Sequence, residues 1–350
     1  MNDPGFAEFL PKLNNHKFLN LKLALAPAAA LPEGLAGMFS GRPAALKLLN
    51  DPSATSEPRT DLGVSMKTHN SLMRIVRLSG GNYRAEQTRI LFRVLSFFMV
   101  PDQAKWRTLI GEPEEDFVES QYIVSSTQVP RIIHQIWIGP KLPPSATFDA
   151  WHAHAKKHGY EYKVWTDIEV AELDVVKTEA FKFFHDRGTY AACADLIRYE
   201  VLLRFGGIYI DADLYPLGTR SLHERIIPYG MSVVAETGAR LHPTTGGTLF
   251  ANSFIATPPA NPVFRRILGK VEEALETFPG ISVWMVPGPY IFTAMTHGFA
   301  NVLGSTFVSR GPNTFTPDVA LFESTLEETR KKRPLAALIP WKPWKQKKRP

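Results

Sequence analysis

The chain has 350 residues, of which 44% are hydrophobic and 21% are charged. This composition is ordinary for a folded globular protein and excludes a fibrous or wholly disordered chain, and the length suggests roughly two domains. The single cysteine, Cys193, excludes a fold held by intramolecular disulfides and a cysteine-rich metal site. We expect Cys193 to be a small packing residue.

The net charge of +6 is concentrated at the carboxyl end. Eight of the 40 basic residues lie within residues 331–350, which contain no acid, so the other 32 nearly balance the 34 acidic residues. A near-neutral body argues against nucleic-acid binding, and we expect no nucleic-acid partner. The basic tail itself leaves several roles open: a solvated end, nucleic-acid contact, weak contact with an anionic membrane, or a lid that includes Trp344.

The sequence predicts no segment that crosses a membrane. Pro27 interrupts the most apolar early stretch, which is far shorter than the about 20 residues that a spanning helix needs. Residues 1–4 lack the basic start of a signal peptide. We therefore expect a cytoplasmic protein, with peripheral membrane attachment as the alternative.

The predicted elements divide the chain near residue 130. Residues 1–125 predict a mainly helical region without recognisable chemistry, including a loop over 50–58 and a helix within 66–100. Apolar runs then predict strands over 131–138, 160–165 and 208–210, and helices are expected over 151–158 and 190–205. This alternation indicates an α/β domain over 126–330, followed by a basic, tryptophan-containing tail over 331–350.

The strongest chemical signal surrounds the third predicted strand. Asp195 and Arg198 are three residues apart and share one face of the preceding helix. Asp211 and Asp213 flank a single residue just past the strand, where two carboxylates can share a hard divalent cation such as Mg²⁺ or Mn²⁺. A solvated loop and a surface ion pair are the ordinary alternatives, but the ordered combination favours a site that binds a metal and a phosphate.

Three ordered stretches resemble glycosyltransferase family 32, which includes yeast outer-chain mannosyltransferases and is similar to the glucosylating domains of large clostridial toxins. The matching stretches are residues 130–139, residues 162–167, and the segment from Ala194 through Gly206-Gly207 to Asp213. The resemblance covers about a quarter of the chain clearly and extends weakly to about residue 295. It implies a GT-A type α/β fold and transfer of a hexose from a nucleotide-sugar with retention of the anomeric configuration.

The resemblance also implies roles for individual residues. It places Asp195, Arg198, Asp211 and Asp213 in catalysis, with Asp211 and Asp213 holding Mn²⁺ or Mg²⁺. It places the donor, a UDP- or GDP-hexose, against Ile136, Trp137, Ala194, Asp195, Arg198, Tyr209 and Asn252. Three of these residues also have a structural alternative: core packing for Trp137 and Tyr209, and capping of a turn for Asn252. We interpret the Pro-Gly-Pro segment at 287–289 as a structural turn.

One departure from the family pattern concerns the metal. Many relatives have a histidine shortly before a late tryptophan, whereas residues 339–344 contain no histidine, so the third protein ligand is undefined. No third acid is positioned as a nucleophile, since Glu200 lies nearer the Tyr199 side of the helix; this favours front-face substitution. We expect a glycan or protein acceptor, in surface polysaccharide or oligosaccharide synthesis. The alternatives are an effector that glycosylates a protein and a non-catalytic nucleotide-sugar-binding protein.

Overall fold

The computed structural model describes residues 103–113, 115–236, 248–278, 281, 283–296, 298–304, 306–309 and 316–342. The chain divides into two compact units, one made of residues 1–111, 236–249 and 270–286, the other of residues 112–235, 250–269 and 287–350. In the described part of the first unit, α6 (Gln103–Ile110) buries Trp106, whose ring centroid lies 5.9 Å from that of Phe278.

The second unit is built on a mixed sheet with the strand order β2-β1-β3-β6-β5-β7. Three strands, β1 (Ile132–Ile136), β2 (Glu161–Trp165) and β3 (Gly207–Ile210), run parallel. Strand β6 (Phe250–Thr257) pairs antiparallel with β3 and with β5 (Met231–Ala235), and β7 (Ala300–Leu303) is parallel to β5. A separate two-stranded sheet joins β4 (Leu214–Pro216) to β8 (Leu338–Pro340).

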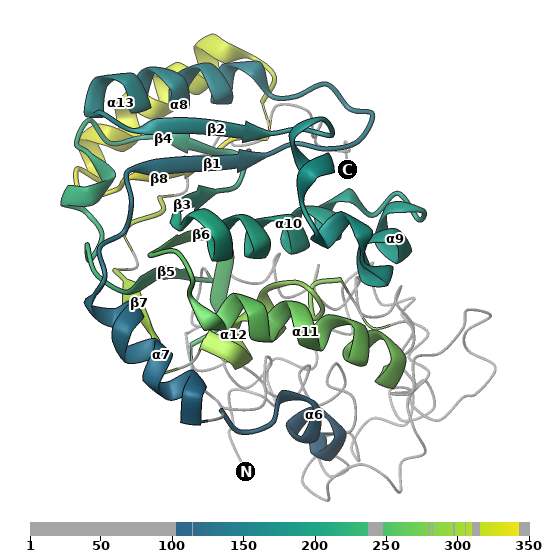
Figure 1. Ribbon diagram of the computed structural model, residues 1–350. Coiled ribbons are helices and arrows are strands. Elements are labelled where there is room, and N and C mark those ends of the chain that lie inside the picture. Colours follow the sequence, from purple (N-terminus) through teal and green to yellow (C-terminus); the bar gives the residue numbers. More distant parts are fainter. Residues whose placement is uncertain are drawn as a thin grey trace, which may run out of the picture. The chain divides into compact units, whose positions relative to one another are not determined.

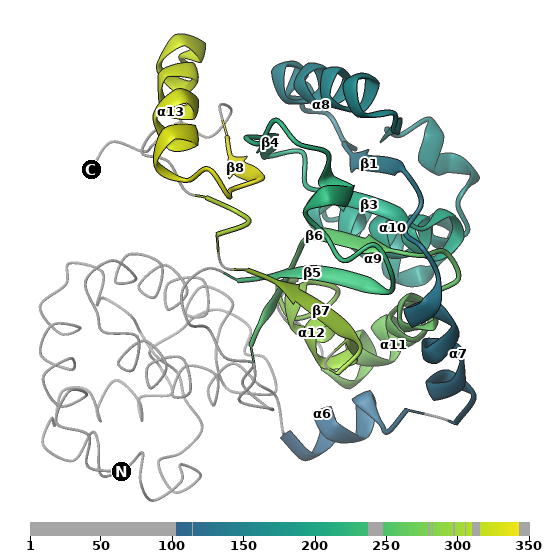
Figure 2. The same ribbon diagram turned by 90° about the vertical axis from the view of Figure 1, so that its left-hand side faces the viewer.

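Helices cover both faces of this sheet, as Figures 1 and 2 show. Helix α8 (Ser145–His158) packs on β2 and β4, α10 (Tyr190–Phe205) on β1 and β3, and α12 (Pro289–Thr296) on β6. The remaining helices and 3₁₀ turns are α7 (Glu115–Ser126), η3 (Glu169–Glu172), η4 (Val175–Lys177), α9 (Glu179–His185), η5 (Leu222–Glu224), α11 (Pro262–Thr277) and α13 (Val319–Lys332).

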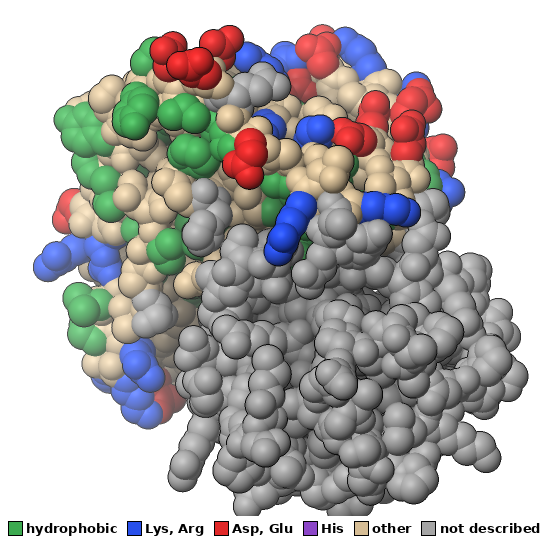
Figure 3. Space-filling view, turned by 90° about the horizontal axis from the view of Figure 1, so that it is seen from below, with side chains coloured by type: hydrophobic (Ala, Val, Ile, Leu, Met, Phe, Trp, Pro, Cys, Tyr) green, Lys and Arg blue, Asp and Glu red, His purple; other side chains and the backbone are tan. Residues whose placement is uncertain are grey.

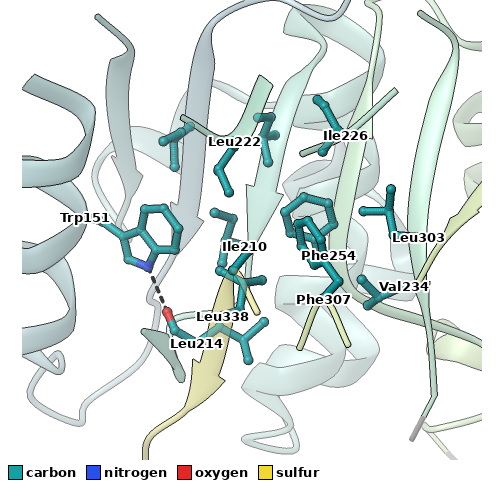
Figure 4. Packing of buried hydrophobic residues seen from close by; sticks show 14 of the residues in the cluster. Trp151, Ile210, Leu214, Leu222, Ile226, Val234, Phe254, Leu303, Phe307 and Leu338 are labelled. Atoms are coloured by element: carbon teal, nitrogen blue, oxygen red, sulfur yellow. Dashed lines mark hydrogen bonds between the residues drawn. The ribbon is translucent and has the colours of Figure 1, made fainter. Parts of the chain in front are cut away.

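The core on one face of the sheet gathers side chains from both sheets and from α8 (Figure 4). Trp151 of α8 is fully buried there, and its indole N–H donates to the carbonyl of Leu214, 2.7 Å away. Ile208 and Ile210 of β3 belong to this cluster. Because side chains alternate along a strand, Tyr209 lies on the opposite face, toward α10, and this alternation brings β3 and α10 together at the candidate site.

The predicted α/β class is confirmed by this mixed sheet with helices on both faces. The three predicted strands correspond to β1, β2 and β3, and the helix predicted over 190–205 is α10. Helix α8 begins at Ser145, six residues before its predicted start, because Pro143 and Pro144 precede its first turn, where the N–H groups need no intrahelical partner. The turn expected at 287–289 leads into α12.

The predicted domain boundaries fall inside helices. Residue 125 lies in α7, and residue 331 lies in the last turn of α13. Beyond α13, β8 adds residues 338–340 to the small sheet, so the predicted tail is part of the fold at least to residue 342. The loop at 50–58, the helix within 66–100 and residues 343–350 lie outside the described residues, and the division of the chain into domains stays a prediction.

The surface of the described part carries both signs of charge. Figure 3 shows Lys and Arg side chains interspersed with Asp and Glu side chains on the face seen there, as the near-neutral composition of residues 1–330 implies. Among the described residues, no helix is long and apolar enough to cross a membrane.

Two consecutive glycines set the tight passage from α10 into β3. Gly206 and Gly207 have φ angles of +60° and +92°. A Cβ on Gly206 would lie 2.4 Å from the backbone nitrogen of Pro259, and one on Gly207 would lie 2.7 Å from the carbonyl oxygen of Ile132. Only glycine therefore lets α10 end and β3 begin so close to the neighbouring strands.

Replacing Gly206 by Ala is expected to lower the free energy of unfolding by about 3 kcal/mol or more, because positive φ and a backbone clash act together. Urea denaturation measures the change. Gly269→Ala is the matched control, since Gly269 lies in α11 with open space around it, and it should stabilise by about 0.5–1 kcal/mol. Equal stabilities for both variants would contradict the steric argument.

Candidate active site

Arg198 is the centre of the candidate site. Its guanidinium forms an ion pair with Asp195 at 2.8 Å and a second with Asp211 at 3.3 Å. The same group donates to the carbonyls of Asn252 and Ala194 and lies over the ring of Tyr209, 4.4 Å from its centroid. Arg198 thus connects α10 to the end of β3 and to β6, and the sequence-predicted pair Asp195–Arg198 is joined to the first acid of the Asp-x-Asp segment.

Buried polar side chains hold these two carboxylates in place. The amide of Asn252 donates to Asp195 at 2.9 Å and to the hydroxyl of Tyr199 at 3.1 Å. The Tyr199 hydroxyl in turn donates to the carbonyl of Pro287 at 2.8 Å. On the other side, the Tyr209 hydroxyl donates to Oδ1 of Asp211 at 2.8 Å. Every polar group of this network that we name has a partner, which fixes the positions of the acids.

The electrostatics of the network follow from its burial. Asp195 and Arg198 are 9% and 5% exposed. Burial raises the pKa of Asp195 to about 6, although Arg198 opposes this shift, so the carboxylate is mainly ionised at pH 7. Burial disfavours the charge of Arg198, but Asp195 and Tyr209 outweigh it and raise the pKa of Arg198. Burial likewise raises the pKa of Tyr209 well above its ordinary value, so its hydroxyl stays protonated and can donate.

The Asp-x-Asp segment turns immediately after β3. The N–H of Asp211 donates to the carbonyl of Ser253, and the carbonyl of Asp211 accepts from the N–H of Leu214, both at 2.9 Å. Asp213 forms an ion pair with Lys342, and its carbonyl accepts the N–H of Trp341 at 2.7 Å. The side chains of Asp211 and Asp213 are 30% and 18% exposed, so both carboxylates remain accessible to solvent.

This donor set fits a hard divalent cation. Two carboxylates one residue apart supply oxygen ligands, and Asp213 already has a cationic partner, the Lys342 ammonium. Oδ1 of Asp211 is engaged by Arg198 and Tyr209, whereas Oδ2 accepts no hydrogen bond from the described residues. Within those residues, no three His, Cys, Asp or Glu side chains cluster as a complete set of metal ligands, so a bound cation would need ligands from water or substrate.

Of the remaining predicted donor residues, Ile136 and Trp137 lie at the carboxyl end of β1, and Ala194 lies in α10. Ile136 is buried at the carboxyl end of β1, and Trp137 follows it, half-buried, with its indole N–H donating to the carbonyl of Lys141 at 2.7 Å. Ala194 contributes its carbonyl to Arg198 at 3.3 Å. Contact of Ile136, Trp137, Ala194, Tyr209 and Asn252 with a donor stays a prediction.

Three residues of the site were not predicted from the sequence: Tyr199, Gln135 and Lys342. Tyr199 lies four residues after Asp195 on the same helix face, a spacing that could have indicated it. Gln135 donates to the carbonyl of Asp211 at 3.3 Å and accepts from Tyr162 at 2.6 Å. Lys342 follows β8, and its contact with Asp213 arises from the pairing of β4 with β8.

Glu200 is not part of this site. Its carboxylate accepts the N–H groups of Asp174 and Val175 at the start of η4 and pairs with Arg204. Glu200 therefore has a structural role on a different side of α10 from Arg198. Histidines do not supply the undefined third ligand in the described part of this site: His185 is near Asp186, and His242 and His297 lie outside the described residues.

His134 supports the site from beneath the α10–β3 passage. It is fully buried, with Nε2 donating to the carbonyl of Gly206 at 2.9 Å and Nδ1 accepting from the indole of Trp165 at 3.1 Å. This arrangement requires the neutral ring. Burial lowers the pKa of His134 to about 4, from an ordinary value of 6.5.

We expect the protein to lose stability as pH falls from 6.5 to 4. In this window the unfolded chain binds a proton at His134 that the folded chain does not, so the free energy of unfolding rises with pH. Over the whole window, protonation of His134 in the unfolded chain lowers the free energy of unfolding by about 3 kcal/mol. Burial lowers the pKa of His154 to about 4 as well, so His154 adds to the slope. Urea denaturation at pH 7 and 5 should show a smaller loss in His134→Gln than in the unsubstituted protein; an unchanged slope would contradict the assignment.

Comparison with known proteins agrees with this geometry. Residues 140–230 match the family model described as "Glycosyltransferase sugar-binding region containing DXD motif". The chain is 30% identical over 115 residues to Inositol phosphoceramide mannosyltransferase 3 of Schizosaccharomyces pombe, covering 31% of each chain. It is 22% identical over 205 residues to Inositol phosphoceramide mannosyltransferase 1 of the same organism, covering 54% of this chain and 60% of that one. The chain thus spans between a third and three fifths of the length of these curated relatives.

A search of solved structures found the PaToxG glycosyltransferase, with a TM-score of 0.40 and 19% identity over 58% of this chain and 79% of that one. The residues matched by the family model include Asp195, Arg198, Tyr209 and the Asp211-Ala212-Asp213 segment, which is the DXD motif. The predicted resemblance is therefore confirmed over residues 140–230, which match the model of glycosyltransferase sugar-binding regions that contain a DXD motif.

Proposed function

We propose that this chain is a metal-dependent, retaining glycosyltransferase that moves a hexose from a nucleoside-diphosphate sugar to a hydroxyl acceptor. The observation that carries the proposal is the placement of Arg198 between Asp195 and Asp211, the first acid of the DXD motif, inside the region that matches the family model. Ligands of α/β sheets bind at the carboxyl ends of strands, and these fixed charges lie at the carboxyl end of β3.

Asp211 and Asp213 would hold Mn²⁺ or Mg²⁺. When bound, such an ion neutralises the negative charge of a leaving diphosphate. The protein's own residues supply the geometry: Tyr209 and Arg198 orient Asp211 through its Oδ1, and the backbone of Trp341 fixes the turn at Asp213.

Asp195 would accept hydrogen bonds from hydroxyls of the donor sugar. Arg198 and Asn252 both point at its Oδ1, at 2.8 and 2.9 Å, so they position this carboxylate. Most of the N–H groups of Arg198 are used within the protein, which makes Arg198 a residue that aligns two acids in addition to any contact it makes with a phosphate. Ile136, Trp137, Ala194 and Tyr209 would complete the donor site.

Retention is best supported as front-face substitution. A double displacement needs a carboxylate beneath the sugar. Glu200, the nearest further acid on α10, is committed to the N–H groups of η4. The leaving phosphate would then take the proton of the acceptor hydroxyl, and the protein would contribute positioning and charge stabilisation.

The similarity to two inositol phosphoceramide mannosyltransferases favours a mannosyl donor and an acceptor that carries an anionic headgroup. A glycan, a protein or a lipid-linked acceptor each present the hydroxyl that the reaction requires. Contact of the basic carboxyl end with an anionic acceptor or membrane would fit this chemistry, because lysines near an anionic surface are attracted to it.

The test is a thermal-shift panel of UDP- and GDP-hexoses with and without Mn²⁺, followed by a hydrolysis assay of each stabilising donor. A donor that binds the native state raises the melting temperature by mass action. We expect one nucleotide class to stabilise the protein in a Mn²⁺-dependent way and to be hydrolysed slowly. Binding without hydrolysis or transfer to any acceptor would support the non-catalytic alternative, and the absence of stabilisation by all donors would contradict the proposal.

A further inference from the structure

We propose that Lys342 is a built-in counter-cation of the DXD motif, which competes with the divalent cation for Asp213 and so weakens metal binding in the donor-free protein. This inference deepens the proposed function, because it concerns the same acids. It rests on the ion pair between the Lys342 ammonium and Oδ2 of Asp213 and on the way the lysine is held there.

Lys342 is held by its neighbour in the chain, Trp341. That residue is 2% exposed, and its backbone N–H donates to the carbonyl of Asp213 at 2.7 Å. Its indole stacks on Phe322 with centroids 4.2 Å apart and donates to the carbonyl of Thr316 at 2.9 Å. The pairing of β8 with β4 ends at the Leu214–Pro340 pair, so both sides of the ion pair follow directly from fixed backbone.

The Lys342–Asp213 pair differs from the surface ion pairs of the same unit. The side chains of Lys342 and Asp213 are 29% and 18% exposed, whereas those of Lys332 and Glu328 are 71% and 55% exposed. Exposed pairs contribute little because water screens them. A partly buried pair whose backbone is already fixed loses less side-chain entropy on forming and is screened less.

Each acid of the motif therefore has its own protein cation. Asp211 is paired with Arg198, which is buried and also holds Asp195. Asp213 is paired with Lys342, whose side chain is partly exposed to solvent. A divalent cation that takes Asp213 as a ligand either displaces the Lys342 ammonium from Oδ2 or binds beside it on Oδ1. In both cases the two positive charges oppose each other at one carboxylate. Removal of the lysine charge should consequently strengthen metal binding, whereas removal of an unrelated lysine should not.

The experiment measures Mn²⁺ binding to the full chain by the loss of the EPR signal of free Mn²⁺. Lys342→Met keeps the aliphatic stem and removes the charge. We expect it to bind Mn²⁺ about tenfold more tightly than the unsubstituted protein, because a tenfold change is small compared with the interaction energy of neighbouring charges at a partly buried site. Lys342→Arg, which retains the charge, should bind Mn²⁺ within about threefold of the unsubstituted protein. Lys332→Met is the matched control and should leave the affinity unchanged.

Asp213→Asn should remove the binding in either background, which assigns the site to this acid. Melting curves give a second readout, since Mn²⁺ should raise the melting temperature more in Lys342→Met than in the unsubstituted protein. Equal or weaker Mn²⁺ binding in Lys342→Met overturns the inference. Donor binding is measured separately, in the thermal-shift panel. If Lys342→Met does not tighten Mn²⁺ binding but a donor still stabilises the protein, the inference about Lys342 is wrong and the proposed glycosyltransfer stands. If Lys342→Met tightens Mn²⁺ binding but no donor stabilises the protein, the proposed function is wrong and the competition for Asp213 stands.

Discussion

Asp213→Asn is expected to reduce donor turnover by about a hundredfold to a thousandfold, the range found when one preorganised charge-stabilising group is removed from an active site. Asn keeps the size of the side chain and one oxygen but lacks the negative charge that attracts a divalent cation. The backbone carbonyl of residue 213 still accepts the N–H of Trp341 in this variant, so the turn after β3 should be retained. The measurement is hydrolysis of the stabilising nucleotide-sugar at saturating Mn²⁺, with unfolding monitored in parallel.

The control for this substitution is Asp318→Asn. Asp318 caps α13 by accepting the N–H of Leu321, at 3.1 Å, and Asn serves this position about as well as Asp. That variant should retain turnover and lose little stability. Chelator should abolish the turnover of the unsubstituted protein and have little further effect on Asp213→Asn. Full turnover in excess chelator, or in Asp213→Asn, would contradict a role for the DXD acids in metal binding.

The part of the site that could be predicted from the sequence consists of local relations. Asp195 and Arg198 lie three residues apart in α10, which ends at Phe205 as predicted. The helix ends there because Gly206 and Gly207 take positive φ angles. Asp211 and Asp213 follow a four-residue strand whose alternation places Tyr209 toward α10. These relations depend on helical and strand periods, which the residues themselves determine.

The contacts that could not be predicted join residues far apart in the chain. Asn252 reaches Asp195 because β6 pairs antiparallel with β3, and Lys342 reaches Asp213 because β8 returns to β4. Neither pairing has a local signal. The basic residues that begin at 331 predict the start of a tail. Lys331 and Lys332 instead lie in the last turn of α13, where positive charges interact favourably with the negative end of the helix dipole.

Arg198→Met is expected to lower the free energy of unfolding by about 3–5 kcal/mol and to abolish donor binding. The substitution leaves Asp195 as a buried carboxyl group without its cation, and it removes the donor to the carbonyl of Asn252. Asp211 also loses one of the two groups that orient its Oδ1. Arg187→Met is the control, because Arg187 is exposed and its guanidinium lies over the ring of Phe183 at the surface, and it should change stability by about 0.5 kcal/mol or less.

Loss of stability alone would also follow from a purely structural ion pair, so further variants separate the two roles. Arg198→Lys keeps the charge but not the planar fork that reaches Asp195 and Asp211 together, so it should fold and yet bind the donor much more weakly. Asp195→Asn with Arg198→Met removes the buried acid that has lost its cation and should recover part of the stability lost in Arg198→Met, which a double-mutant cycle measures. Donor binding should not recover, because the carboxylate that we propose to receive the sugar hydroxyls is gone. If Arg198→Lys binds and hydrolyses the donor as well as the unsubstituted protein, the alignment of the two acids by Arg198 is not needed for the reaction, and the pair has only a structural role.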